Sequence, residues 1–268
     1  MKFSISNIAW SAEQDKEVLE FLAEKHFDGI EVAPTRIFAE KPYSKIRQAK
    51  KYRSFLWDNY RLEVASIQSI WYGRNENIFG STSERTALLE YSKCAFEFAN
   101  ALNCKNLVFG CPKNRNMREP HKDLDIAYAF FKELGGEAEK AGVVIALEAN
   151  PKIYHTNFIN FTEAAYEFSK KINSPGIGVN YDMGTVIANG EKIEDVRKYI
   201  KQINHVHISE PFLEQIKFGK QHIMLLKLLY ELNYKNYISV EMKASNSIEG
   251  IKDVLNILFN QRSTYEMG

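Results

Sequence analysis

The sequence of 268 residues has only three cysteines, Cys94, Cys104 and Cys111, and their spacing is irregular. So few thiols exclude a disulfide framework and a cysteine-rich zinc site, and they indicate a reducing compartment. No apolar run reaches the roughly 18 residues of a membrane span, and the first residues lack the charged-then-apolar layout of a secretory signal. The sequence therefore predicts a cytoplasmic protein with no membrane segment.

An excess of charge of either sign is also missing. There are 35 Lys and Arg residues against 34 Asp and Glu residues, so the formal net charge is +1. A general nucleic-acid binder needs surplus basic residues to contact phosphates, so this balance argues against nucleic acid as a partner. No stretch rich in Pro, Gly or Ser and no long charge run marks a linker. We therefore expect one domain over residues 1–268.

What the sequence does contain is a short apolar run that recurs along the chain, followed each time by a loop and a segment with helical periodicity. The spacing fits a strand plus a crossover helix, which takes on the order of 30 residues. Eight such units predict an α/β fold, a single closed (β/α)8 TIM barrel of about 250 residues. An open doubly wound sheet is the alternative, but no glycine-rich dinucleotide motif follows the first run. The runs are residues 2–6, 29–33, 63–69, 106–110, 143–149, 176–181, 203–209 and 237–242.

In such a barrel the active site lies at the carboxyl ends of the strands. The last four runs carry Glu148, Asp182, His207 and Glu241 near these ends. Side chains two positions apart share one face of a strand, so these polar residues point to the barrel axis if the aliphatic residues point to the helices. Three carboxylates and an imidazole at one barrel mouth repel each other and lose hydration unless a cation neutralises them. We therefore expect one divalent metal ion at these four residues.

The donor set also indicates which metal to expect. Oxygen-rich ligation with one nitrogen suits Mn²⁺, Mg²⁺ or Co²⁺ better than a structural zinc, which prefers thiolates. We favour Mn²⁺, with Mg²⁺, Co²⁺ and Zn²⁺ as alternatives. Each residue alone has an ordinary interpretation, because strand-end carboxylates often cap helices and buried histidines often serve as hydrogen-bonding residues. Four of them at successive strand ends point to a functional site.

These residues resemble those of the xylose isomerase-like TIM barrels, which include sugar phosphate isomerases and epimerases, tagatose 3-epimerase-like enzymes and apurinic endonucleases. The resemblance spans nearly the whole chain and is carried by Glu148 in LEANP, Asp182 in NYDMGT, His207 in HVHISEP and Glu241 in SVEMK. It implies that the four residues bind the metal and that Glu148 and Glu241 also act as acid and base on opposite faces of a substrate carbon. Polarisation of a carbonyl by the metal lowers the cost of forming an enediolate by proton removal.

One position departs from the sugar-epimerase pattern, because Thr185 stands where those enzymes carry a histidine that contacts substrate. The resemblance therefore favours a metal-dependent isomerase or epimerase of a sugar or sugar phosphate, without fixing free ketoses as substrates. A dehydratase on the same metal platform is the alternative. An apurinic endonuclease is a weaker hypothesis, since it needs basic loops and further metal histidines, and Gln68 and Gly110 stand near strand ends where these are sought. A non-catalytic sugar-binding protein conflicts with the retention of both glutamates.

Further residues near the strand ends are candidates for contacting a small sugar or sugar phosphate. Lys113 and Arg115 follow the fourth run and offer charge to a phosphate, a carboxylate or a hydroxyl, unless their loop is simply solvated. Lys243 shares a face with Glu241 and either pairs with that glutamate or contacts substrate. Trp10 offers an aromatic face to sugar C–H groups, or packs at the barrel mouth.

Three more positions complete the set of candidates. Glu31 either accepts a hydrogen bond from substrate or ties neighbouring strands together, and Gln68 lies in the third run, near its end. His222 stands at the start of the helix after the seventh run, where we expect it to cap or pack that helix. Similar barrels often form dimers or tetramers, so the resemblance also implies self-association.

Overall fold

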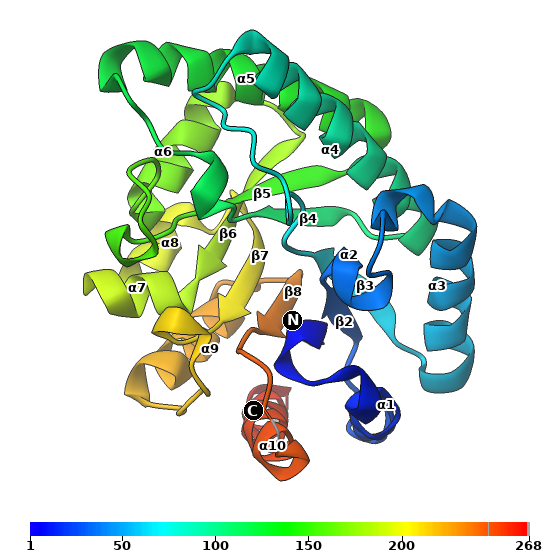
Figure 1. Cartoon of the computed structure of the whole chain (residues 1–268). Coiled ribbons are helices and arrows are strands. Elements are labelled where there is room, and N and C mark those ends of the chain that lie inside the picture. Colours follow the sequence, from blue (N-terminus) through cyan, green and yellow to red (C-terminus); the bar gives the residue numbers. More distant parts are fainter. Residues whose placement is uncertain (246, 267–268) are drawn as a thin grey trace.

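Eight parallel strands close into a barrel in which the strand order follows the sequence (Figure 1). The structure, a computed structural model, describes residues 1–245 and 247–266. The barrel closes where β1 pairs with β8, with Lys2 opposite Tyr237 and Ile5 opposite Val240. The predicted (β/α)8 TIM barrel is thereby confirmed. The strands are β1 (Lys2–Ser6), β2 (Gly29–Val32), β3 (Glu63–Ile67), β4 (Asn106–Phe109), β5 (Val144–Glu148), β6 (Ile177–Asp182), β7 (Ile203–Ile208) and β8 (Tyr237–Val240).

Helices surround the barrel on its outer side (Figure 1). Each predicted run coincides with one strand, and no boundary differs by more than two residues. The α-helices are α1 (Asp15–Glu24), α2 (Pro34–Ile37), α3 (Ile46–Tyr60), α4 (Thr82–Leu102), α5 (Pro120–Ala141), α6 (Thr162–Ile172), α7 (Met183–Asn189), α8 (Val196–Tyr199), α9 (Lys220–Glu231) and α10 (Ile248–Glu266). Short 3-10 turns are η1 (Asn7–Ala9), η2 (Ala12–Gln14), η3 (Pro42–Ser44), η4 (Pro112–Asn114), η5 (Lys152–Tyr154), η6 (Ile193–Asp195) and η7 (Pro211–Leu213).

Local chemistry sets where the helices begin and end. The Ser81 hydroxyl accepts a hydrogen bond from the backbone N–H of Glu84, and the Glu84 carboxylate accepts one from the N–H of Ser81, so α4 begins with two otherwise unpaired donors satisfied. Gly142 ends α5 in a left-handed conformation with φ of 71°, which costs glycine little because it has no Cβ. None of the helices in the described part of the chain combines the length and apolarity of a membrane span.

Polar side chains of the strands point into the interior of the barrel, where the candidate site lies. The Ser4 and Ser239 hydroxyls meet at 2.5 Å between β1 and β8, and Asn106 Nδ2 donates to Ser66 Oγ at 2.8 Å between β4 and β3. Aliphatic residues of the strands are buried in the hydrophobic core instead. The alternation therefore sends polar side chains toward the barrel axis, as the sequence pattern predicts.

Candidate metal centre and substrate pocket

Four donor residues meet at the carboxyl ends of the last four strands. Glu148 ends β5, Asp182 ends β6, His207 lies in β7, and Glu241 directly follows β8. Each offers one donor atom, and these atoms all lie within 4.8 Å of one another. Parallel pairing places Asp182 opposite His207, so the register brings these side chains to one level of the barrel. The structure thus gathers the four residues that the sequence predicts as metal ligands.

His207 stands at the centre of this group. Its Nδ1 lies 3.1 Å from Glu148 Oε1, 3.1 Å from Glu241 Oε2 and 4.0 Å from Asp182 Oδ2. Its Nε2 lies 3.1 Å from the carboxylate oxygens of Glu31 on β2. A neutral imidazole carries one N–H, and donation from Nε2 to Glu31 leaves the Nδ1 lone pair facing the three carboxylates. A carboxylate behind the distal nitrogen is the usual support of a metal-binding histidine.

Hydrogen bonds from neighbouring residues fix the carboxylates. Asn180 Nδ2 donates to Glu148 Oε1 at 2.6 Å and lies 3.1 Å from His207 Nδ1. Asn150 Nδ2 donates to Glu148 Oε2 at 3.0 Å. Gln68 Nε2 donates to Glu241 Oε1 at 2.9 Å. Both glutamates therefore have one oxygen near His207 and the other oriented by an amide.

Asp182 is held by the start of the next helix. It caps α7 by accepting a hydrogen bond from the backbone N–H of Thr185 at 2.6 Å, and Ser209 Oγ donates to its other oxygen at 2.5 Å. The Thr185 hydroxyl donates to the carbonyl of Ala149 at 2.8 Å. Strand alternation places Asn150, Asn180 and Ser209 on the same face as the candidate ligands, but none of them was among the predicted site residues.

The electrostatics of the group show a shortage of positive charge. Burial and the Glu148 carboxylate raise the pKa of Asp182, and burial raises the pKa of Glu241 to about 7. Burial opposes protonation of His207, but the carboxylates of Glu241 and Glu31 raise its pKa well above the usual value. Without a metal, the cluster therefore attracts a proton onto the imidazole. The donor set of three carboxylates and one imidazole fits a divalent cation, which supplies this charge.

A cavity of about 270 Å³ opens over the metal donors. Gly110 leaves room for a carboxylate in its wall, because a Cβ here would lie 2.7 Å from Glu148 Oε2. The lining combines metal donors with residues of the loops after the strands. It consists of Ile8, Gln68, Ser69, Val108, Gly110, Cys111, Pro112, Glu148, Asn150, Tyr154, Asp182, Glu210, Leu213 and Glu241.

Comparison with known proteins agrees with this architecture. A family model described as the xylose isomerase-like TIM barrel matches residues 19–261. The chain belongs to this family. The uncharacterized protein MJ1311 of Methanocaldococcus jannaschii is 27% identical to it over 275 residues, which cover 96% of this chain and 90% of that protein.

Solved structures share the fold of this xylose isomerase-like barrel. A D-tagatose 3-epimerase-like protein has a TM-score of 0.76 and 23% identity, covering 100% of this chain and 99% of that chain. The IOLI protein, whose structure holds a zinc atom, has a TM-score of 0.73 and 18% identity, covering 99% of both chains. At such identities the similarity establishes the barrel architecture.

Of the predicted substrate-binding residues in this xylose isomerase-like barrel, Gln68 lines the cavity and contacts Glu241. Glu31 lies below, fully buried, with its carboxylate against His207 and 2.9 Å from His205 Nε2. The latter contacts tie β2 to β7 across the interior. Trp10 is buried in the hydrophobic core and donates from its indole N–H to Asp15 at 2.7 Å.

The three predicted cations lie outside the cavity lining. Lys113 is exposed and donates to Asn75 Oδ1 at 2.8 Å. Arg115 is fully buried, and its Nη1 donates to the backbone carbonyl of Glu148 at 2.9 Å. Lys243 pairs with Glu214 at the surface. Of the three, only Lys243 has a carboxylate as its partner in this structure.

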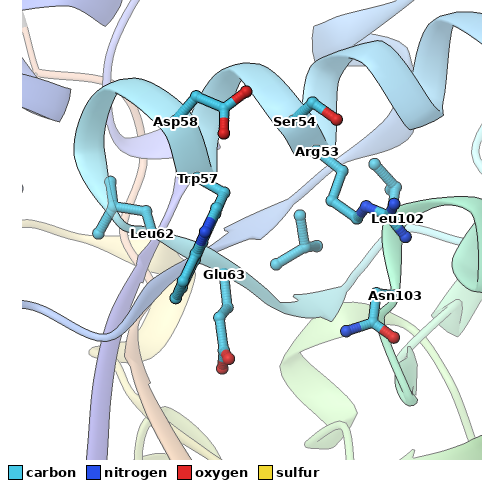
Figure 2. Close-up of a pocket in the computed structure, with 9 residues that line it drawn as sticks. Arg53, Ser54, Trp57, Asp58, Leu62, Glu63, Leu102 and Asn103 are labelled. Atoms are coloured by element: carbon cyan, nitrogen blue, oxygen red, sulfur yellow. The ribbon is translucent and has the colours of Figure 1, made fainter.

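A separate cavity of about 300 Å³ lies at the opposite end of the barrel, between α3 and the start of β3 (Figure 2). Trp57 projects from α3 beside Glu63, the first residue of β3, and Asn103 follows α4 on the other side. This end of a TIM barrel serves stability, whereas the carboxyl ends of the strands carry catalysis. The cavity that contains Glu148 and Glu241 is therefore the candidate functional site.

Proposed function

We propose that the protein is a divalent-metal-dependent isomerase or epimerase of a sugar or sugar phosphate. The observation that carries this proposal is the arrangement of Glu148 and Glu241, which line one cavity and each lie 3.1 Å from His207 Nδ1. Together with Asp182 and His207, these two glutamates would hold a divalent ion, for which Mn²⁺ is favoured, and the ion would supply Lewis-acid polarisation of a carbonyl and the hydroxyl next to it.

Glu148 and Glu241 are suited to transfer the proton. They reach the cavity from β5 and from the end of β8, two strands separated by β6 and β7. A substrate carbon between them has a carboxyl group on each side, so one glutamate removes the proton next to the carbonyl and the other returns a proton to the resulting enediolate. Return to the opposite face of the same carbon inverts that centre, and return to the neighbouring carbon gives isomerisation.

Three positions support sugar chemistry over DNA repair. Gln68 and Gly110 follow the third and fourth strands, and Thr185 hydrogen-bonds to Ala149. None of these three supplies a nitrogen ligand for a metal cluster. Cleavage of a DNA backbone requires several metal ions and basic loops.

The test combines metal content with proton exchange. Purified wild type should hold about one divalent ion per chain after incubation with Mn²⁺, and His207→Ala should weaken this binding. Glu148→Gln should abolish solvent deuterium incorporation into a ketose while the protein stays folded. Glu63→Gln, at the opposite end of the barrel, is the matched control and should bind metal and exchange deuterium as wild type does. Unchanged exchange in Glu148→Gln removes its role as base, and two or three zinc ions per chain point to a nuclease.

A further inference from the structure

A fourth carboxylate lines the same cavity and is separate from the metal donors. Glu210 follows β7 in the sequence HISEP, and it lines the cavity together with Glu148, Asp182 and Glu241. Its side chain is 19% exposed. A carboxylate in the wall of a substrate cavity accepts hydrogen bonds only, because an ionised carboxylate has no proton to donate.

His222 at the start of α9 holds the backbone directly before this carboxylate. The backbone N–H of Gly219 donates to His222 Nδ1 at 3.2 Å, so the proton of the neutral ring sits on Nε2. Nε2 lies 3.6 Å from Glu210 Oε1 and 3.5 Å from the Ser209 carbonyl. His222 thus caps its helix, as the sequence predicts, and its remaining N–H donates to the carbonyl of Ser209, the residue before Glu210. Burial lowers its pKa, so the ring is neutral at pH 7.

The backbone around Glu210 is fixed on two sides. Gly184 at the start of α7 lies so close that a Cβ there would come within 3.0 Å of the Glu210 carbonyl, and the Gly184 N–H donates to Ser209 Oγ at 2.8 Å. Phe212 has a left-handed backbone with φ of 59°, and its N–H donates to the hydroxyl of Tyr154 at 2.7 Å. A non-glycine residue in this conformation persists only where its surroundings hold it. The loop therefore presents Glu210 from a defined position.

The charge of the cavity determines which ligands it accepts. Its described lining contains four carboxylates and no lysine or arginine. Of the nearby cations, Lys243 pairs with Glu214, while Lys113 and Arg115 donate to neutral oxygens of Asn75 and of the Glu148 backbone, and none of the three lines the cavity. One divalent ion at the metal donors leaves Glu210 with its own negative charge. A phosphate ester placed beside it meets repulsion, whereas sugar hydroxyls donate charge-assisted hydrogen bonds to it.

We propose that Glu210, positioned by His222, binds hydroxyl groups of an uncharged sugar and so selects free sugars against sugar phosphates. This inference rests on the proposed function, whose substrate class it narrows. Glu210 contacts substrate directly, and His222 is a positioning residue that acts through it.

The experiment uses the full-length protein loaded with Mn²⁺ and three pairs of probes: D-fructose, D-tagatose and D-xylulose, each with its phosphate ester. Wild type should bind at least one free sugar, and should bind its phosphate at least tenfold more weakly. In Glu210→Gln, which keeps the shape but removes the charge, KM for the free sugar should rise about tenfold while kcat changes little. His222→Phe should raise KM in the same direction, and His222→Gln, which retains a donor, should restore part of the affinity.

Glu214→Gln is the matched control, because Glu214 lies in the same loop but pairs with Lys243 at the surface. It should leave KM unchanged, and the metal content of every variant should equal that of wild type. A phosphate ester that binds more tightly than its free sugar overturns the inference, as does wild-type KM in Glu210→Gln. If sugars exchange deuterium in wild type while Glu210→Gln is unaffected, this inference fails and the proposed function stands. If wild type binds metal but neither binds nor exchanges any probe, both fail.

Discussion

Glu31 and His207 face each other across the inside of the barrel, with the imidazole Nε2 3.1 Å from the carboxylate although the two residues lie on β2 and β7. Both side chains are fully buried. The contact fixes the ring so that its other nitrogen points to Glu148, Asp182 and Glu241. Glu31 therefore acts on the metal site from below, without lining the cavity.

The first prediction concerns this contact. Glu31→Gln keeps the volume of the side chain but replaces one carboxylate oxygen with an NH2 group. This group is a donor and cannot accept the N–H of His207, so the ring loses its fixed orientation. We expect Mn²⁺ to bind about 10- to 100-fold more weakly, as is typical when the support of a metal ligand is removed. Titration calorimetry measures the affinity. Glu63→Gln is the control, and wild-type affinity in a folded Glu31→Gln protein contradicts the prediction.

A second prediction concerns the cavity wall at Gly110. A Cβ here would lie 2.7 Å from Glu148 Oε2, so Gly110→Ala displaces a carboxylate that Asn150 and Asn180 hold in place. Deuterium exchange into substrate should fall at least tenfold. Gly136→Ala in α5 is the matched control, since a Cβ there meets nothing within 4 Å. It should keep full activity and gain about 0.5–1 kcal/mol of unfolding free energy, because alanine favours helix.

Acid should weaken the contact of Glu63 with Lys2 and Tyr237, at the end of the barrel opposite the candidate metal site. Burial opposes ionisation of Glu63, but hydrogen bonds from Lys2 and Tyr237 outweigh it and lower its pKa below the ordinary value of 4.5. A carboxylate whose pKa is lowered by folding stabilises the protein above the unfolded pKa and loses this effect as the pH falls through the folded pKa. Urea unfolding should show Glu63→Gln less stable than wild type at pH 7, by about 1 kcal/mol or less because the pair is half-exposed. The difference should shrink below pH 4.5, and a difference that grows on acidification contradicts the assignment.

The three thiols should differ in reactivity. Burial raises the pKa of Cys104 and of Cys111 to about 12, whereas Cys94 is exposed. The thiolate is the reactive form, so a thiol reagent at pH 8 should modify one cysteine quickly in the native protein and all three in urea. Cys94→Ser should remove the fast phase. Rapid modification of Cys104 in the folded protein would falsify this ranking.

The grouping of the four candidate metal donors could be predicted because they lie on regular strands or directly after one. Period-two alternation determines which face Glu148 and His207 take, and parallel pairing brings neighbouring strand ends to one level. The contacts of the long cationic side chains were harder to predict, because a position after a strand does not determine which partner a flexible side chain reaches. Arg115 turns inward to the Glu148 carbonyl, while Lys113 and Lys243 reach surface partners.

Glu210 was not predicted as a site residue, for a different reason. It lies beyond the regular strand, in a loop where Phe212 and Leu213 both adopt left-handed backbone conformations. Neither residue type signals such a turn, and the histidine that holds the backbone before Glu210 comes from α9. Only the order of polar residues in HISEP hinted at a further group near the cavity.

The pairing of β1 with β8 also governs when the molecule can assemble. The Ser4 and Ser239 hydroxyls that meet there are 235 positions apart in the chain. Contacts of such long sequence separation form slowly, because the entropy of closing the intervening chain must be overcome first. During synthesis β1 has exposed edge groups until β8 leaves the ribosome. Nascent chains are therefore expected to depend on chaperones until β8 has been synthesised.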